Sequence, residues 1–134
     1  MISTTDLHST AREYLRAAKL LRTRNSYDAS VYLCGYAVEI ALKASICRHL
    51  KWATGFPETN ADFQEKGPLL KTHNLKMLIE YTGVQDRVRF LMLTDWSLIT
   101  KWSPEQRYNP IGTKSQTDAN EMIAATQKLL RILL

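Results

Sequence analysis

The sequence contains few cysteines and no apolar run of membrane-spanning length. Its two cysteines, Cys34 and Cys47, lie thirteen residues apart in a predicted helix. That spacing separates them by roughly 20 Å, whereas a disulfide needs Cα atoms within about 7 Å of each other. Two free thiols fit a reducing compartment, and residues 1–14 are too polar for a signal peptide. Since no apolar run approaches the roughly 20 residues of a membrane span, we expect a cytoplasmic protein that does not enter a membrane.

The chain also lacks the short motifs of several common enzyme classes. There is no GxGxxG or GxxxxGK(S/T) phosphate loop, no CxxC or HExxH metal motif and no GxSxG nucleophile turn. The three histidines, His8, His49 and His73, show no metal-ligand spacing. We therefore expect no metal and no cofactor. These absences argue against NAD-dependent, P-loop, zinc and hydrolase functions.

The remaining composition is that of a globular protein. The hydrophobic fraction is 45% and the charged fraction 23%. A chain of 134 residues predicts one domain over residues 1–134. The net charge of +5 is compatible with a polyanionic partner, but the basic residues are scattered rather than grouped in a run.

Apolar residues recur at helical spacing along most of the chain. Residues 27–50 are apolar around almost the whole helix, which is typical of a helix buried between others. All four prolines fall in two segments, Lys51–Thr72 and 103–116, where we expect loops. The predicted fold class is all-α, an up-down helical bundle with an antiparallel hairpin of the first two helices. Its roughly five helices are placed at 4–24, 27–50, 73–83, 84–102 and 117–134.

One polar stripe follows the buried second helix. Tyr32, Tyr36, Glu39 and Lys43 are spaced by four, three and four residues and share one face, which Asp28 extends. A buried carboxylate is costly without a partner. Two arrangements are open at this point. Glu39 forms an i,i+4 pair with Lys43, worth a few tenths of a kcal/mol, or it lines a cleft and pairs with a cation from another element.

The segments "AVEIALK", "THNL" and "WSPEQRYNP", in this order and spacing, resemble the HEPN domain, found in prokaryotes and higher eukaryotes. The resemblance covers nearly the whole chain. It implies an up-down helical bundle, usually a homodimer, with a polar cleft between protomers. Many HEPN proteins are metal-independent RNases with an Arg-x(4–6)-His motif, often toxins encoded beside a nucleotidyltransferase. Others lack the motif and bind RNA or nucleotides.

This chain departs from the RNase pattern, because no arginine is followed by a histidine at the required spacing. Arg107, the cation we expect to pair with Glu39, is followed by "YNPIGTK". Three residues are candidates for catalysis, namely Arg107, His73 and Tyr108. A second set is predicted to bind the ligand and comprises Tyr32, Tyr36, Glu39, Lys43, Arg107 and Tyr108.

Each candidate also has a purely structural interpretation. We expect His73 to hydrogen-bond locally at the start of its helix, and Tyr108 either to pack beneath its loop or to meet the ligand. Trp96 and Trp102 could stack on a base, but we expect them to be core or dimer-interface residues.

Three functions from different classes follow. The first is a homodimeric nucleotide- or RNA-binding module, with a possible nucleotidyltransferase partner in a toxin–antitoxin-like system. The second is a metal-independent RNase toxin with an atypical site. The third is a non-catalytic structural dimerisation adaptor.

Overall fold

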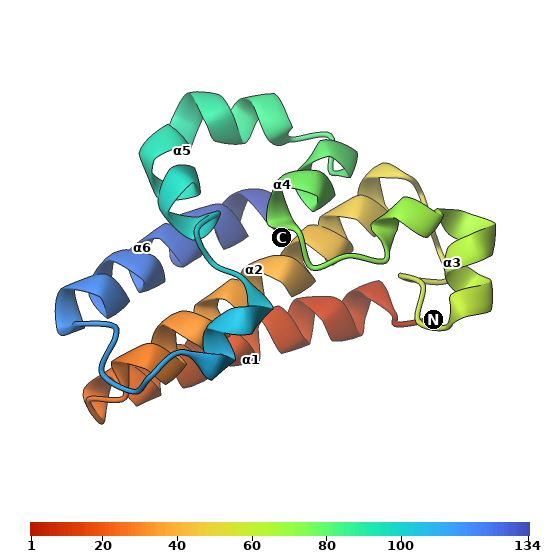
Figure 1. Cartoon of the computed structure of the whole chain (residues 1–134). Helices are drawn as coiled ribbons and strands as arrows, with labels where there is room; N and C mark the ends of the chain where they lie inside the picture. The colour runs from red at the N-terminus through yellow and green to blue at the C-terminus, as the bar shows by residue number, and fades with distance from the viewer.

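The first two helices form the antiparallel pair that the sequence predicts. In the computed structural model, which describes residues 1–134, α1 (Thr4–Thr23) and α2 (Tyr27–His49) lie side by side (Figure 1). Ser3 caps α1, since its side chain accepts a hydrogen bond from the Asp6 backbone N–H. Asn25 in the link has a left-handed conformation (φ 63°), which asparagine tolerates better than most residues. The chain therefore reverses within three residues.

Helix α2 is the core of the fold. Thirteen of its 23 residues are buried, because α1 covers it on one side and α6 (Gln116–Leu133) on another. This helix is long and apolar enough to cross a membrane, although no membrane span was predicted from the sequence. However, 72% of the apolar stretch of this helix is buried against other parts of the fold, as in a core helix.

Helix α6 begins at a capping box. The Ser115 side chain accepts from the Asp118 N–H at 3.1 Å, and the Asp118 carboxylate accepts from the Ser115 N–H at 2.8 Å. The cap is Ser115, so the helix begins at Gln116, one residue before the predicted start. The helix then runs along α2 and buries its apolar face there.

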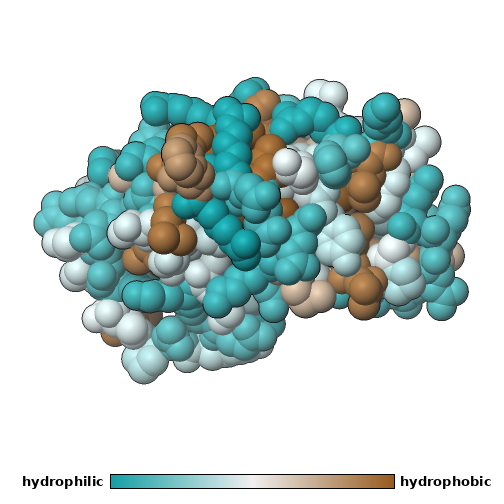
Figure 2. Space-filling model, turned by 90° about the horizontal axis from the view of Figure 1, so that it is seen from above, coloured by the Kyte–Doolittle hydropathy of each residue, from teal (hydrophilic) through white to brown (hydrophobic).

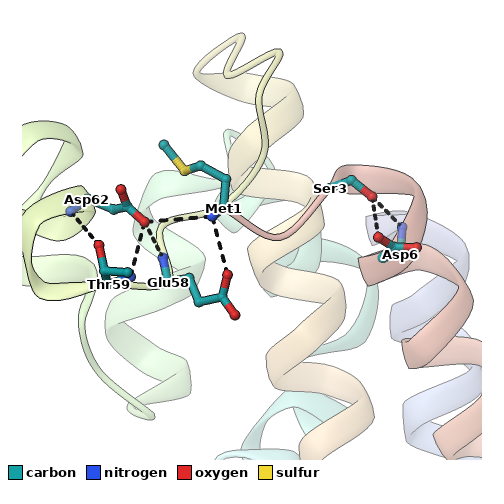
Figure 3. Close-up of polar contacts among 6 residues, drawn as sticks. All are labelled: Met1, Ser3, Asp6, Glu58, Thr59 and Asp62. Carbon is teal, nitrogen blue, oxygen red and sulfur yellow. Dashed lines mark hydrogen bonds and ion pairs between the residues drawn. The ribbon is translucent and has the colours of Figure 1, made fainter.

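The segment Lys51–Thr72, predicted as a loop, contains the helix α3 (Asn60–Lys66) and the 3₁₀ turn η1 (Pro68–Leu70). Thr59 and Asp62 cap α3 reciprocally, as Figure 3 shows. Buried Phe56 exchanges two backbone hydrogen bonds with Ile2, at 2.9 and 2.8 Å. This isolated bridge is the only strand-like pairing. The segment is thus anchored to the start of α1.

Two short helical segments follow and lead to α5. Helix α4 (Leu75–Leu78) continues into the 3₁₀ turn η2 (Ile79–Tyr81). The chain leaves it at Gly83, whose positive φ of 76° favours glycine. The predicted helix at 73–83 is therefore shorter than expected. Both α2 and η2 contact α4, which places its first residues over the face of α2.

Helix α5 (Gln85–Ile99) crosses above the bundle and bends at Met92, where φ is −150° and ψ 46° (Figure 1). Its buried face is filled at steps of four, four and three by Val88, Met92, Trp96 and Ile99. Leu91, although apolar, lies outside this face and is 58% exposed.

The fold class is confirmed, with six α-helices rather than about five. The additional one is α3. A third 3₁₀ turn, η3 (Pro104–Tyr108), lies in the second predicted loop. Trp96 and Trp102 are both buried, as expected for core residues.

Candidate functional site

The polar stripe of α2 is present, and its two tyrosines form one end of it. The rings of Tyr32 and Tyr36 meet edge to face at a centroid distance of 5.1 Å, and their hydroxyls are 3.4 Å apart. Trp102 packs against Tyr36 at 5.0 Å and donates its indole N–H to the Tyr32 carbonyl at 3.1 Å. The segment that follows α5 is thereby fixed to this end of the stripe.

Glu39 is the buried acid of the stripe, with 3% of its surface exposed. Its Oε2 accepts from Lys43 Nζ at 3.1 Å, and its Oε1 lies 2.8 Å from His73 Nδ1. Both carboxylate oxygens therefore have a charge-bearing or polar partner, which a buried carboxylate requires. The expected pairing of Glu39 with Arg107 is wrong, because no ion pair within 4.0 Å joins them. The pair with Lys43, one turn further along α2, is the arrangement present.

His73 reaches across the fold, contrary to the expectation of a local hydrogen bond. Asn74 caps α4 instead, since its side chain accepts from the Met77 N–H at 3.2 Å. The His73 ring is thus free to contact Glu39, 34 residues away in sequence. A carboxylate can only accept, so Nδ1 donates the hydrogen in this contact and Nε2 is the ring nitrogen left without this partner. The side chain is 61% exposed, which leaves a ring of fixed orientation at the surface.

Lys43, predicted to bind the ligand, is largely occupied by contacts within the protein. Its side chain is only 18% exposed. In addition to the bond with Glu39, its ammonium lies 5.3 Å from the centroid of the Phe56 ring, in a cation–π contact. We conclude that Lys43 mainly neutralises Glu39.

Arg107 belongs to the tyrosine end of the stripe. Its guanidinium carbon lies 4.9 Å from the centroid of the Tyr108 ring. Hydrogen bonding to the Tyr108 hydroxyl, and then to that of Tyr32, raises the pKa of Arg107. Tyr108 is 75% exposed, so it does not pack beneath its loop. Arg107 is also exposed, and the pair forms an accessible cation with an aromatic face.

Tyr36 lies between the two ends. The hydrogen bond shared with Tyr32 is the main reason why the pKa of Tyr36 rises to about 12, followed by burial. The negative charge of Glu39 adds to the rise, and the positive charge of Arg107 opposes it. The six predicted ligand-binding residues therefore form two clusters, one around Glu39 and one around Arg107.

A hollow of about 540 Å³ adjoins these clusters. Its walls come from residues 72–76 at the start of α4 and from residues 100–105 after α5, and they include His73, Trp102 and Glu105. Such a volume is ordinary for a ligand pocket. The sequence analysis missed Asn74, Thr100 and Ser103 as lining residues. Ser103 precedes Pro104, and this Ser-Pro start of a helical turn is the signal that could have drawn attention to it.

The side chains in this region do not form a metal site. No group of three or more His, Cys, Asp or Glu side chains lies close enough to hold an ion. The arrangement offers instead a fixed imidazole, an exposed guanidinium and several hydroxyl groups. These groups suit an anionic, hydrogen-bonding ligand such as a phosphate ester.

Comparison with known proteins gives one match. The family model of the HEPN domain matches residues 4–53. These residues comprise α1, α2 and the start of the segment that leads to α3, so the match includes the whole polar stripe. No curated protein and no solved structure matches the chain.

Proposed function

We propose that this chain, whose residues 4–53 match the HEPN domain family, is a nucleotide- or RNA-binding module. The observation that carries this proposal is the contact of exposed His73 with buried Glu39 beside the hollow. Because this contact holds Nδ1, it leaves the other imidazole nitrogen, Nε2, to meet the ligand. Arg107, near Tyr32, supplies a permanent positive charge. Lys43 supports the site by neutralising Glu39.

Fluorescence anisotropy with a labelled single-stranded RNA and with AMP as competitor tests the proposal. We expect Arg107→Ala to weaken RNA binding and to lower the slope of log K against log salt by about one, since one phosphate contact is lost. The control is Arg12→Ala, which removes an exposed arginine of α1. Equal effects of the two substitutions would show that Arg107 contributes only net charge.

The Glu39–His73 contact also favours a second function, metal-independent RNA cleavage. In this reaction the 2′-oxygen attacks phosphorus while His73 Nε2 accepts its proton, and the bond from phosphorus to the 5′-oxygen breaks. Arg107 would stabilise the charge that develops on the phosphoryl oxygens. Water or Tyr108 would protonate the leaving oxygen. The absence of the usual Arg-x(4–6)-His histidine is why this function ranks second.

Incubation of purified protein with total RNA in the presence of EDTA decides between binding and cleavage. Cleavage that disappears in His73→Ala and Arg107→Ala would establish the RNase function. Cleavage that persists equally in both variants would identify a contaminating nuclease. Intact RNA, together with binding in the anisotropy assay, would support the binding module.

The proposal includes a homodimer and a nucleotidyltransferase as possible partner protein. For the homodimer, the surface that supports it is the outer face of α5, where Phe90, Leu91 and Leu93 are exposed. For the nucleotidyltransferase and the toxin–antitoxin role, the support is the family resemblance alone. Co-purification of the neighbouring gene product with the tagged chain would test it.

A further inference from the structure

A second hollow, of about 610 Å³, continues from the first. Lys76 and Thr100 line both hollows and form the ridge between them. The second hollow lies between α4 with η2 and the two halves of α5, so it is built from residues outside the matched range 4–53. The two hollows are thus adjacent, and we refer to them together as the trough.

Three cations line this trough without a carboxylate partner. Lys76, Arg89 and Lys101 are exposed and form no ion pair within 4.0 Å. Of the 18 lysines and arginines, only Arg16, Lys43 and Lys128 form an ion pair within 4.0 Å, so the three cations of the trough are distinguished by their place around one hollow. Unpaired cations on several elements around one hollow are the usual footprint of a phosphate-bearing ligand.

Two carboxylates also line the trough, and neither forms an ion pair with these cations within 4.0 Å. Glu80 lies in the second hollow, and no cation is within 4.0 Å of it, although Lys76 precedes it by one helical turn. Glu105 lies in the first hollow. Hydrogen bonds from its own backbone N–H and from Ser103 lower its pKa, so its charge is directed toward the start of η3.

Neutral hydrogen-bonding groups complete the lining. Gln85, Ser97 and Thr100 face the second hollow. Hydroxyl and amide groups of this kind commonly contact the sugar and phosphate of nucleic acids, and they carry no sequence preference. The buried Trp96 supplies an apolar base.

We propose that the trough holds a single strand of RNA that passes from the first hollow over the ridge into the second. Lys76, Arg89 and Lys101 meet successive phosphates. This inference rests on the proposed function and specifies its ligand: an oligonucleotide occupies both hollows, whereas a mononucleotide fills only the first. Single strands suit a groove with spaced cations, since their backbone adapts to it.

Anisotropy with two probes separates the two levels of the proposal. The probes are a labelled uridine oligomer of about ten nucleotides and labelled AMP. We expect Arg89→Ala and Lys101→Ala each to weaken oligomer binding about fivefold and to lower its salt slope by about one, with AMP binding unchanged. His73→Ala should weaken binding of both probes. Arg12→Ala is the charge-matched control, and thermal unfolding verifies that each variant folds.

Three results would overturn the inference. If Arg89→Ala and Lys101→Ala bind the oligomer like the unmodified protein while His73→Ala does not, the proposed function stands and the trough is not the path. If both substitutions weaken AMP binding equally, the second hollow belongs to a mononucleotide site. If the unmodified protein binds neither probe, the proposed function and the inference both fail.

Discussion

At the scale of single residues, Gly35 decides how the second loop is attached to α2. Trp102 packs so closely over this glycine that a Cβ at position 35 would lie 2.1 Å from the indole ring. The same indole contacts Tyr36 and hydrogen-bonds the backbone of Tyr32. The absence of a side chain at Gly35 therefore positions the chain that leads to Arg107.

This contact predicts an inverted effect of Gly35→Ala. In a helix interior, alanine normally stabilises relative to glycine by about 1 kcal/mol. Here the added methyl group overlaps Trp102, so we expect net destabilisation of about 1–3 kcal/mol. Urea denaturation measures it. In a Trp102→Leu background the same substitution should lose most of its cost. A higher urea midpoint for Gly35→Ala alone would contradict the packing described.

Tyr36 predicts a loss of stability at alkaline pH. Its folded pKa is raised from the ordinary value of 10.0 to about 12. A raised pKa means that the folded state holds the proton more tightly, so the contribution is complete below pH 10 and is lost between about pH 10 and 12. Denaturation midpoints across this range should fall less steeply for Tyr36→Phe. Tyr14→Phe is the control, and an equal slope in both variants would contradict the prediction.

At the scale of elements, Asp28 has a different role from the one its spacing suggested. It was expected to extend the polar stripe of α2. Instead its carboxylate accepts from the backbone N–H groups of Gly112 and Lys114, both at 2.9 Å. The first turn of α2 thereby fixes the loop between η3 and α6, a loop in which Ile111 is 98% exposed.

Replacement of Asp28 by alanine should release this loop. The loss of two charge-assisted hydrogen bonds should cost about 1–3 kcal/mol of unfolding free energy. It should also increase the rate of limited proteolysis within residues 109–115. Asp86→Ala is a matched control, since Asp86 is an exposed acid in the first turn of α5. Equal proteolysis rates for the two variants would show that Asp28 does not hold the loop.

The accuracy of sequence prediction also differed between elements. The long helices were predicted within a few residues because their apolar periodicity extends over several turns. Helix α3 was missed because it is seven residues long and buries no side chain, so it has no such periodicity. Its signal was the cap, Thr59 followed three residues later by Asp62.

At the scale of the whole molecule, the outer surface of α5 is unusual. Phe90, Leu91 and Leu93 are 88%, 58% and 61% exposed. Figure 2, seen from above, shows hydrophobic residues among hydrophilic ones on this side of the molecule. Three large exposed apolar side chains within four residues of one helix are a candidate protein–protein interface. Substitution of these exposed residues can therefore test whether the chain forms a homodimer through α5.

The double substitution Phe90→Ser with Leu93→Ser should lower the dimer fraction in sedimentation velocity. Because both side chains are exposed, we expect the unfolding free energy to change by no more than about 0.5 kcal/mol. Leu20→Ser is the control, since Leu20 is an exposed leucine on α1. A dimer that survives the double substitution would place its interface elsewhere, and a protein that is monomeric throughout would contradict the homodimer.

The sequence by itself determined the all-α class, the hairpin of α1 and α2 and the shared face of Tyr32, Tyr36, Glu39 and Lys43. These features depend on helical periodicity, which acts between residues three or four positions apart. The i,i+4 contact of Glu39 with Lys43 is local in the same sense.

Only the tertiary structure decided the second partner of Glu39. His73 reaches it because Asn74 takes over the cap of α4 and because α4 packs on α2. Arg107 lies by the tyrosines instead, because Trp102 attaches its segment at Gly35. The trough likewise joins α4 to α5. Such contacts join residues far apart in sequence, and no periodicity within one segment encodes them.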